Sequence, residues 1–204
     1  MNIITHRVGE LQANCYFLVK DKECLIIDPG DSADFLLEEI SRNNYTVTAI
    51  IATHGHFDHV MAVGEMQLAL GVPFYMNHDD EFLIKRLGET AKYFLGYEPH
   101  VLKPQTIINL LPGNRTIDEF KFSVIHTPGH TPGSSCLYFK EEDILFTGDT
   151  LFKAGIGRYD FSYSDKKELF RSLYEIFKLP DETLVNSGHG DPTTIGEEKI
   201  KYEI

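Results

Sequence analysis

The sequence has few positive charges for its size. Its 204 residues include 19 Lys and Arg against 31 Asp and Glu, which gives a formal net charge of −12. Such a chain repels nucleic acids and other polyanions rather than attracting them. We therefore expect a small-molecule substrate and no nucleic-acid partner. Carboxylates that bind divalent cations would no longer count as free negative charge.

Long apolar runs and abundant cysteines are also absent. No window approaches the roughly 18 consecutive apolar residues of a membrane span. The N-terminal segment lacks the basic stretch, apolar run and cleavage site of a signal peptide. Cys15, Cys24 and Cys136 are far apart among apolar neighbours, a pattern typical of buried reduced thiols. These absences predict a cytoplasmic protein without a membrane partner and leave its oligomeric state open.

Apolar runs and turn residues predict a mixed α and β chain. Strands are expected at 15–19, 24–27, 47–52, 72–76, 106–110, 120–126, 135–140, 143–147 and 183–186. Helices are expected at 32–43, 60–70, 78–95, 165–178 and 194–202. Residues 96–105 contain two prolines and are expected to form a loop, so the segment 78–105 is either a lid or part of the core. Because no linker divides the chain, residues 1–204 are expected to form one domain.

The most informative stretch is THGHFDHV at residues 53–60. It follows the predicted strand 47–52 and therefore lies in a strand-to-helix loop, where α/β proteins often place their chemistry. Residues two apart at a strand end point to the same side, so His54 and His56 can face one ion. Asp58 and His59, turning into the helix, can face a second ion. Imidazole and carboxylate groups are expected ligands for zinc, iron or manganese.

Each ion would need further ligands from elsewhere in the chain. His130 in TPGHTPGS, Asp149 in TGDT and His189 in SGHG are the natural suppliers. Each stands at the end of a predicted strand and beside a glycine, which lets the backbone approach closely. His6, His78 and His100 lack such partners and are interpreted as structural or solvated.

Together these segments resemble the metallo-β-lactamase-fold hydrolases. HGHFDH and the three later ligands match that superfamily in order and approximate spacing, and IIDPGD near the start matches as well. TPGHTPGSSCLYF and LFTGDTLFKAGIGRYDF are most similar to the hydroxyacylglutathione hydrolase (glyoxalase II) branch, particularly its short bacterial forms. The resemblance implies an α/β (α+β) fold: a four-layer αβ/βα sandwich of two mixed β-sheets flanked by helices.

The resemblance also implies how the ligands are shared between two divalent metal ions, with zinc expected first and iron or manganese as alternatives. The first ion would be bound by His54, His56 and His130, the second by Asp58, His59 and His189, and both by a bridging Asp149.

The implied reaction is attack of a hydroxide, formed at the two metal ions, on a thioester carbonyl. A thioester suits this site because its leaving thiol has a pKa of about 8.5. The thiol can therefore leave as a thiolate without a strong general acid. Asp58 would also orient the hydroxide. Asp28, in the DPG turn, either orients a ligand from outside the metal shell or is a plain turn residue.

Candidate substrate contacts lie in the segment after Asp149. Arg158 falls where the branch has a basic residue for the glutathione carboxylate. Tyr159 and Lys153 are further candidates, with an ordinary surface loop as the alternative for all three. Asp160 and Asp191 stand where the branch has tyrosines that bind glutathione. The helical glutathione-binding C-terminal domain of longer members is not expected here. Recognition of glutathione is therefore left open.

Residues 93–100 contain three aromatic side chains and a histidine that either wall the active site or pack in the core.

Two other activities remain compatible with this resemblance. A persulfide dioxygenase has a similar GxGRxDF segment, but its single iron would use the equivalents of His54, His130 and Asp149 only. A lactonase can share all seven ligands. A β-lactamase and an RNA-processing nuclease are less favoured, the first by the bridging Asp149 and the absent export signal and the second by the acidic balance. Retention of the complete ligand set favours a thioester hydrolase acting on a substrate such as S-lactoylglutathione.

Overall fold

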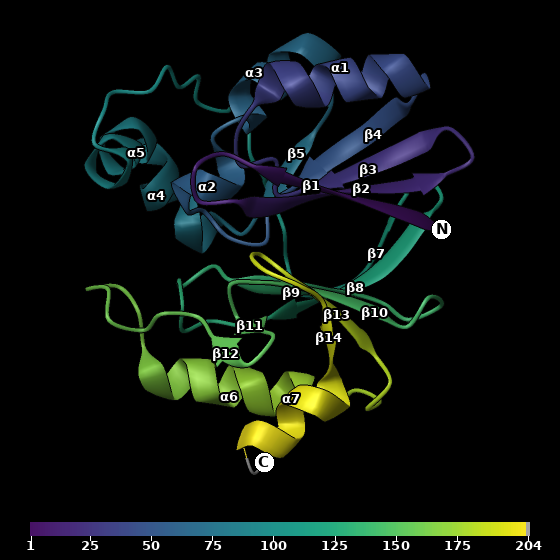
Figure 1. Cartoon of the computed structure of the whole chain (residues 1–204), viewed down its shortest axis with the longest axis vertical. Coiled ribbons are helices and arrows are strands. Elements are labelled where there is room, and N and C mark those ends of the chain that lie inside the picture. The colour runs from purple at the N-terminus through teal and green to yellow at the C-terminus, as the bar shows by residue number, and fades with distance from the viewer. Residues whose placement is uncertain (203–204) are drawn as a thin grey trace.

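The chain forms two six-stranded β-sheets. They face each other, and helices cover the outer side of each (Figure 1). The computed structural model describes residues 1–202. Helices α1 (Ala33–Asn43) and α3 (Val63–Leu70) cover the first sheet, and α6 (Lys166–Ile176) and α7 (Ile195–Tyr202) cover the second. The order helix, sheet, sheet, helix confirms the predicted four-layer sandwich. Within residues 1–202, no helix is both long and apolar enough to cross a membrane.

Both sheets are mixed. The first has the order β1-β2-β3-β4-β5-β6, formed by β1 (Asn2–Val8), β2 (Ala13–Lys20), β3 (Glu23–Ile27), β4 (Thr46–Ile51), β5 (Phe74–Met76) and β6 (Ile108–Asn109). The second has the order β14-β13-β10-β9-β8-β7, formed by β7 (Gly113–Ile117), β8 (Phe120–His126), β9 (Ser135–Phe139), β10 (Ile144–Gly148), β13 (Leu184–Ser187) and β14 (Thr193–Thr194). A small ribbon is formed by β11 (Leu151–Phe152) and β12 (Gly155–Ile156).

The central strands are mostly apolar and buried because both of their faces are covered. In β2, neighbouring residues point to opposite sides: Phe17 packs in the cluster under α1, and Leu18 packs between the two sheets. Phe146 of β10 reaches the same space between the sheets from the other side. A third cluster lies between the second sheet and α6, to which Leu169 and Leu173 belong.

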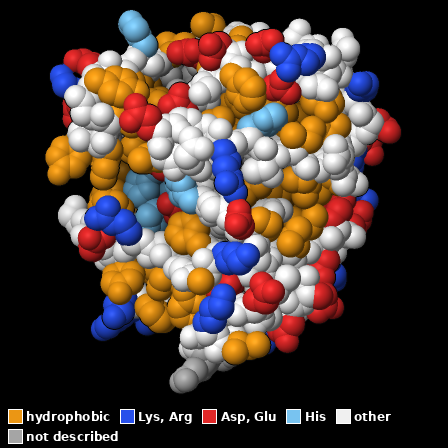
Figure 2. Space-filling view, in the orientation of Figure 1, with side chains coloured by type: hydrophobic (Ala, Val, Ile, Leu, Met, Phe, Trp, Pro, Cys, Tyr) orange, Lys and Arg blue, Asp and Glu red, His pale blue; other side chains and the backbone are white. Residues whose placement is uncertain are grey.

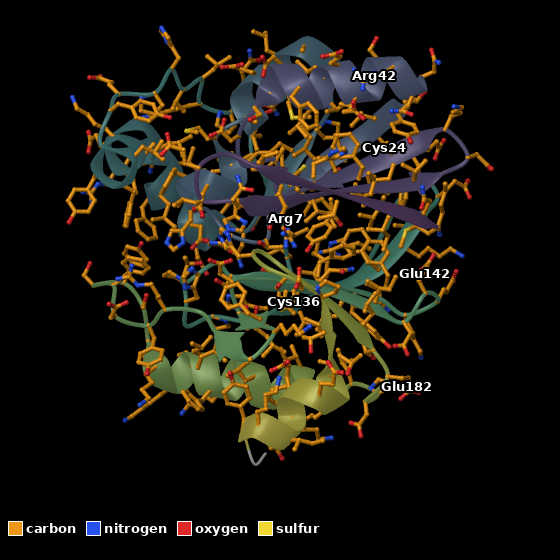
Figure 3. All side chains as sticks on the ribbon, in the orientation of Figure 1. Arg7, Cys24, Arg42, Cys136, Glu142 and Glu182 are labelled. Carbon is orange, nitrogen blue, oxygen red and sulfur yellow. The ribbon has the colours of Figure 1, made fainter. Side chains whose placement is uncertain are left out.

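The three cysteines are free and buried, as expected. Figure 3 labels Cys24 in the first sheet and Cys136 in the second, so these two thiols lie in different layers.

Strand ends bring the predicted site residues to one edge of the sandwich. The parallel strands β3 and β4 lead to Asp28 and His54, and the parallel strands β10 and β13 lead to Asp149 and His189. The carboxyl ends of parallel strands meet at the same edge of a sheet. The backbone N–H of Ser135 donates to the carbonyl of Thr53 at 2.9 Å, which joins the two sheets there.

Two of the expected helices are divided. Residues 78–95 form a 3₁₀ turn (His78–Asp80), α4 (Glu81–Lys85) and α5 (Leu87–Leu95), with Arg86 at φ −103° between the helices. The break lets α4 and α5 each bury its own short apolar face, which one straight helix would not do. Similarly, the helix expected at 60–70 is preceded by the separate short helix α2 (Phe57–Val60), and α3 begins only at Val63.

We expect Phe146→Ala to destabilise the protein strongly. The side chain is fully buried, and its ring contacts those of Tyr16 and Phe139 edge-on at 4.9 and 5.6 Å. Removing it should lower the free energy of unfolding by about 3 to 5 kcal/mol, measured by urea denaturation. Phe170→Ala on the exposed side of α6, where the residue is 38% exposed, is the control. Equal losses in the two variants would contradict this description of the core.

Candidate metal centre

Nitrogen atoms of three buried histidines meet at one point of this edge. The Nε2 atom of His54 lies 3.1 Å from Nδ1 of His56, and Nε2 of His130 lies 2.9 Å from that same Nδ1. His54 and His56 come from the loop after β4, and His130 comes from the loop between β8 and β9. Three converging imidazoles form a donor set that can hold one transition-metal ion.

A second cluster lies beside the first. The short helix α2 begins within the histidine motif and turns Asp58 and His59 towards His189, which follows β13. Nε2 of His189 lies 3.2 Å from Oδ2 of Asp58, and Nε2 of His59 lies 3.8 Å from the same oxygen. These three groups form a separate set of nitrogen and oxygen donors within reach of one ion.

The carboxylate of Asp149 stands between the two clusters. Its Oδ2 atom is 3.6 Å from Nε2 of His130, and its Oδ1 atom is 3.3 Å from Nε2 of His59. The two carboxylate oxygens therefore face different clusters, Oδ2 the first and Oδ1 the second. This is the geometry that a carboxylate bridging two ions requires.

Burial and the carboxylates set the charges of these groups. Burial lowers the pKa of His56 to about 3 and lowers that of His54 well below its ordinary value, so both imidazoles are neutral. Burial alone would also lower the pKa of His59, but Asp149 and Asp58 raise it well above its ordinary value. Burial would raise the pKa of Asp149, yet His59 holds it well below its usual range. A metal ion at the second cluster would replace the proton of His59.

Hydrogen bonds at the outer nitrogens orient all five histidines inward. His54 Nδ1 is bonded to Thr53 Oγ1, His56 Nε2 to the hydroxyl of Tyr163, His59 Nδ1 to Asp28, His130 Nδ1 to the carbonyl of Arg158, and His189 Nδ1 to the carbonyl of Leu11, at 2.8 to 3.1 Å. The other nitrogen of each imidazole therefore faces the clusters, where it offers a lone pair once it carries no proton.

Two buried atoms of the clusters have no hydrogen-bond partner. They are Nε2 of His59 and Oδ1 of Asp149. Buried polar atoms are almost always satisfied, because an unpaired one costs about 1 to 3 kcal/mol. The inward lone pairs and these unsatisfied atoms together fit a pair of bound cations.

Asp28 supports two of the histidines. Its Oδ1 accepts the backbone N–H of Thr53, and its Oδ2 accepts the Thr53 hydroxyl, both at 2.7 Å. The same Oδ2 is 3.1 Å from Nδ1 of His59. Asp28 therefore orients His59 directly and His54 through Thr53, which is more than a plain turn residue does.

Asp80 is a buried residue of the site that the sequence interpretation missed. Its Oδ2 accepts the N–H of Gly55, at 2.8 Å, and the hydroxyl of Thr131, while its Oδ1 accepts the N–H of Gly133 at 2.7 Å. It thereby ties the loop of His54 and His56, next to Gly55, to the loop of His130. In the sequence it is one of two adjacent aspartates at a predicted helix start, where no local pattern distinguishes it from a solvated residue.

Close packing explains two glycines of the motifs. A Cβ atom at Gly157 would lie 1.9 Å from the carbonyl oxygen of Asp149, and one at Gly188 would lie 2.2 Å from Oδ1 of Asp149. A side chain at Gly157 would displace the backbone carbonyl of Asp149, and one at Gly188 would displace its carboxylate.

A hollow of about 260 Å³ opens beside Asp58 and Asp149. Figure 2 shows histidine side chains within a recess that hydrophobic side chains border. Arg158 lines this hollow, whereas Lys153 borders a neighbouring one next to His189. Tyr159 does not line either, and its ring lies under the Lys166 ammonium at 5.3 Å.

The segment 78–105 is neither entirely a lid over the hollow nor entirely part of the core, because its residues differ in what they contact. Phe94 of α5 lines the hollow and stacks on Phe57 with ring centroids 5.6 Å apart, whereas Tyr93 is 82% exposed. The loop 96–105 packs on α3 instead: the backbone N–H of Gln105 donates to Gln67 at 2.8 Å.

We expect Asp80→Ala to destabilise the two histidine loops, although it replaces none of the seven candidate ligands. The variant leaves the buried N–H groups of Gly55 and Gly133 unsatisfied, so the free energy of unfolding should fall by about 3 kcal/mol or more. Metal affinity should fall by about tenfold to a hundredfold, as for other groups that orient ligands. Urea denaturation and metal titration measure the two effects. Asp79→Ala, at the exposed neighbouring position, is the matched control. Indistinguishable results for the two variants would show that Asp80 does not position these loops.

Comparison with known proteins agrees with this geometry. Residues 8–189 match the Metallo-beta-lactamase superfamily. Hydroxyacylglutathione hydrolase GloC of Haemophilus influenzae is 37% identical over 98% of this chain and 95% of its own. Among solved structures, the BLEG-1 B3 metallo-beta-lactamase is 36% identical with a TM-score of 0.89, covering 98% of this chain and 97% of its own. TTHA1623 in a di-iron-bound form is 37% identical with a TM-score of 0.88, covering 96% of each chain. The chain therefore belongs to the metallo-beta-lactamase superfamily.

Proposed function

We propose that this metal-dependent hydrolase is binuclear and cleaves thioesters such as S-lactoylglutathione. The observation that carries the proposal is the carboxylate of Asp149, which directs one oxygen to each of two complete donor clusters. The similarity to a hydroxyacylglutathione hydrolase supports the substrate class.

The first ion would be held by His54, His56 and His130, the second by Asp58, His59 and His189, and Asp149 would contact both. Zinc is the ion we propose, with iron and manganese as alternatives, because these donors suit all three. The di-iron form of TTHA1623 makes iron a specific rival. When bound, two such ions make water a nucleophile at neutral pH and polarise a carbonyl oxygen.

The chain's own groups position the reactants. We propose that the carboxylate of Asp58 orients the attacking water towards a bound carbonyl, which the position of Asp58 in the lining of the hollow supports. Asp28 keeps His59 and His54 in their inward orientation. Because a thiolate leaves without strong acid assistance, the site needs no dedicated proton donor for the leaving group.

The second donor cluster separates this proposal from a persulfide dioxygenase. A single iron held by His54, His130 and Asp149 would not need Asp58, His59 and His189 to converge on a second point. A lactone or a β-lactam would meet the same chemistry, and one solved relative is named a B3 metallo-beta-lactamase. We therefore place both compounds in the substrate panel.

We also propose a cytoplasmic enzyme that acts on a small molecule. The three buried free thiols suit a reducing compartment.

Purified protein should contain two divalent ions per chain and hydrolyse S-lactoylglutathione without consuming oxygen. Elemental analysis, thiol release and oxygen uptake measure these properties in one preparation, alongside a lactone and a β-lactam. Chelation should abolish hydrolysis and lower Tm, because ions that bind only the folded state stabilise it. One iron per chain with sulfite formed from a persulfide would refute the hydrolase.

Asp149→Ala should lose bound metal and activity together, because both clusters lose a shared ligand. Elemental analysis and thioester hydrolysis are the measurements. Asp181→Ala, which removes an exposed aspartate of the same charge, should keep full activity. Full activity of Asp149→Ala would remove the bridging assignment.

A further inference from the structure

Tyr163 lines the hollow and is also bonded to a candidate metal ligand. It belongs to the segment between β12 and α6, and its side chain is among those that line the hollow. Its hydroxyl oxygen lies 2.8 Å from Nε2 of His56, the outer nitrogen of that imidazole. One phenol group therefore contacts both the metal centre and the space for a substrate.

The side chain of Tyr163 is held on several sides. Its ring stacks on that of Phe161, with centroids 5.4 Å apart, and contacts the Phe82 ring edge-on at 5.2 Å. The next residue is tied to the loop of His130, because the hydroxyl of Ser164 donates to the carbonyl of His130 at 2.7 Å. A side chain held in this way is preorganised for a ligand, since little conformational freedom remains to be lost on binding.

Metal binding at His56 would decide the direction of its hydrogen bond to Tyr163. Nδ1 of His56 faces the first cluster, so an ion bound there would leave the ring proton on Nε2. Nε2 would then donate, and the oxygen of Tyr163 would accept. Within residues 1–202 this hydroxyl has no hydrogen-bond partner other than His56. The phenol's own proton is therefore available to an acceptor in the hollow.

Arg158 supplies further donors on the same wall. Its guanidinium lies 4.4 Å from the centroid of the Phe161 ring, on which Tyr163 stacks as well. Nε and one Nη of Arg158 donate to Asp160 at 2.9 Å, which leaves its other N–H groups for a further acceptor. Both Arg158 and Tyr163 line the hollow. This wall therefore suits the part of a substrate that is rich in carbonyl or carboxylate oxygens.

The hydroxyl of Tyr163 lies to one side of the point where a carbonyl would be attacked. It contacts the outer nitrogen of His56, so the whole imidazole separates it from the first cluster. In S-lactoylglutathione the lactoyl group ends close to the reacting carbonyl, whereas the thiol part extends much further and carries amides and carboxylates. The thiol part is therefore the part of this substrate that can reach the hydroxyl.

We infer that Tyr163 is a substrate-binding residue whose hydroxyl donates to a carbonyl or carboxylate oxygen in the thiol part of the thioester. The same hydroxyl supports His56 by accepting its Nε2 proton. The inference rests on the proposed thioester hydrolysis and adds a specificity-determining residue to it. Tyr163 takes no part in bond breaking.

Two lactoyl thioesters with different thiol parts test the inference. S-lactoylglutathione carries amides and carboxylates in its thiol part, whereas the lactoyl thioester of ethanethiol carries no acceptor oxygen there. Tyr163→Phe removes the hydroxyl and keeps the ring. With metal in excess, kcat/KM for S-lactoylglutathione should fall about tenfold relative to that for the ethanethiol ester, because only the former loses a hydrogen bond.

Binding provides a measurement that does not depend on turnover. S-methylglutathione has the same thiol part and no thioester to cleave. Its Kd for the metal-loaded protein, measured by calorimetry, should rise about tenfold in Tyr163→Phe. Tyr174→Phe is the matched control, because it removes the hydroxyl of a tyrosine that is 55% exposed on α6. It should change neither the ratio of the two kcat/KM values nor this Kd.

The support of His56 is measured separately, by metal titration. Tyr163→Phe removes the acceptor of the Nε2 proton, so metal affinity should fall by about tenfold. This loss affects both thioesters equally, and excess metal compensates for it. It therefore leaves the ratio of the two kcat/KM values unchanged.

The outcomes separate the inference from the proposed function. If Tyr163→Phe lowers kcat/KM for both thioesters by the same factor and leaves the Kd of S-methylglutathione unchanged, the hydroxyl only supports His56. The inference is then wrong, and the thioester hydrolase stands. If metal-loaded wild-type protein hydrolyses neither thioester, the proposed function fails and the inference fails with it.

Discussion

The structure depends on bringing seven polar side chains to one buried point. Desolvating imidazoles and carboxylates is costly unless their lone pairs and charges are matched. Here the outer nitrogen of each candidate histidine is hydrogen-bonded to an oxygen, and the inner nitrogens face one another and the carboxylates. Two of these inner atoms, Nε2 of His59 and Oδ1 of Asp149, are buried without a hydrogen-bond partner. Bound cations are the counterpart that such an arrangement lacks. The sandwich makes the convergence possible, because two pairs of parallel strands from different sheets end at the same edge.

Two aspartates that are not candidate ligands hold this arrangement together in different ways. Asp28 acts within the first sheet, where it joins the end of β3 to the loop after β4 through Thr53 and His59. Asp80 acts between the sheets, because its carboxylate joins Gly55 of one histidine loop to Gly133 of the other. A small relative movement of the two sheets would separate His130 from His54 and His56. Asp80 resists that movement directly, so the geometry of the candidate metal centre depends on a residue from a 3₁₀ turn that is not itself a candidate ligand.

Much of the fold and the meeting of the seven candidate ligands at one edge could be predicted from the sequence, because both leave local signals. Histidines beside glycines at strand ends are rare by chance, and the central strands are continuous apolar runs. The edge strands β1 and β7 escaped prediction because their segments, NIITHRV and GNRTI, mix polar and apolar residues and are buried on one side at most. The role of Asp80 could not be predicted either. Its three donors come from two loops, one about 25 and the other about 50 residues away, and only the tertiary structure brings them together.

In the segment GIGRYDF, different atoms of Arg158 contact the candidate metal centre and the hollow beside it. The backbone carbonyl of Arg158 accepts the Nδ1 proton of His130 and so fixes a candidate ligand, whereas its side chain faces the hollow and pairs with Asp160. A change of side chain at these positions keeps the carbonyl where it is, so substrate preference can change while the metal centre is preserved. Hydrolases of one superfamily can therefore share strand-end ligands and still differ in substrate. In this chain the division lies within Arg158 itself, between its backbone and its side chain.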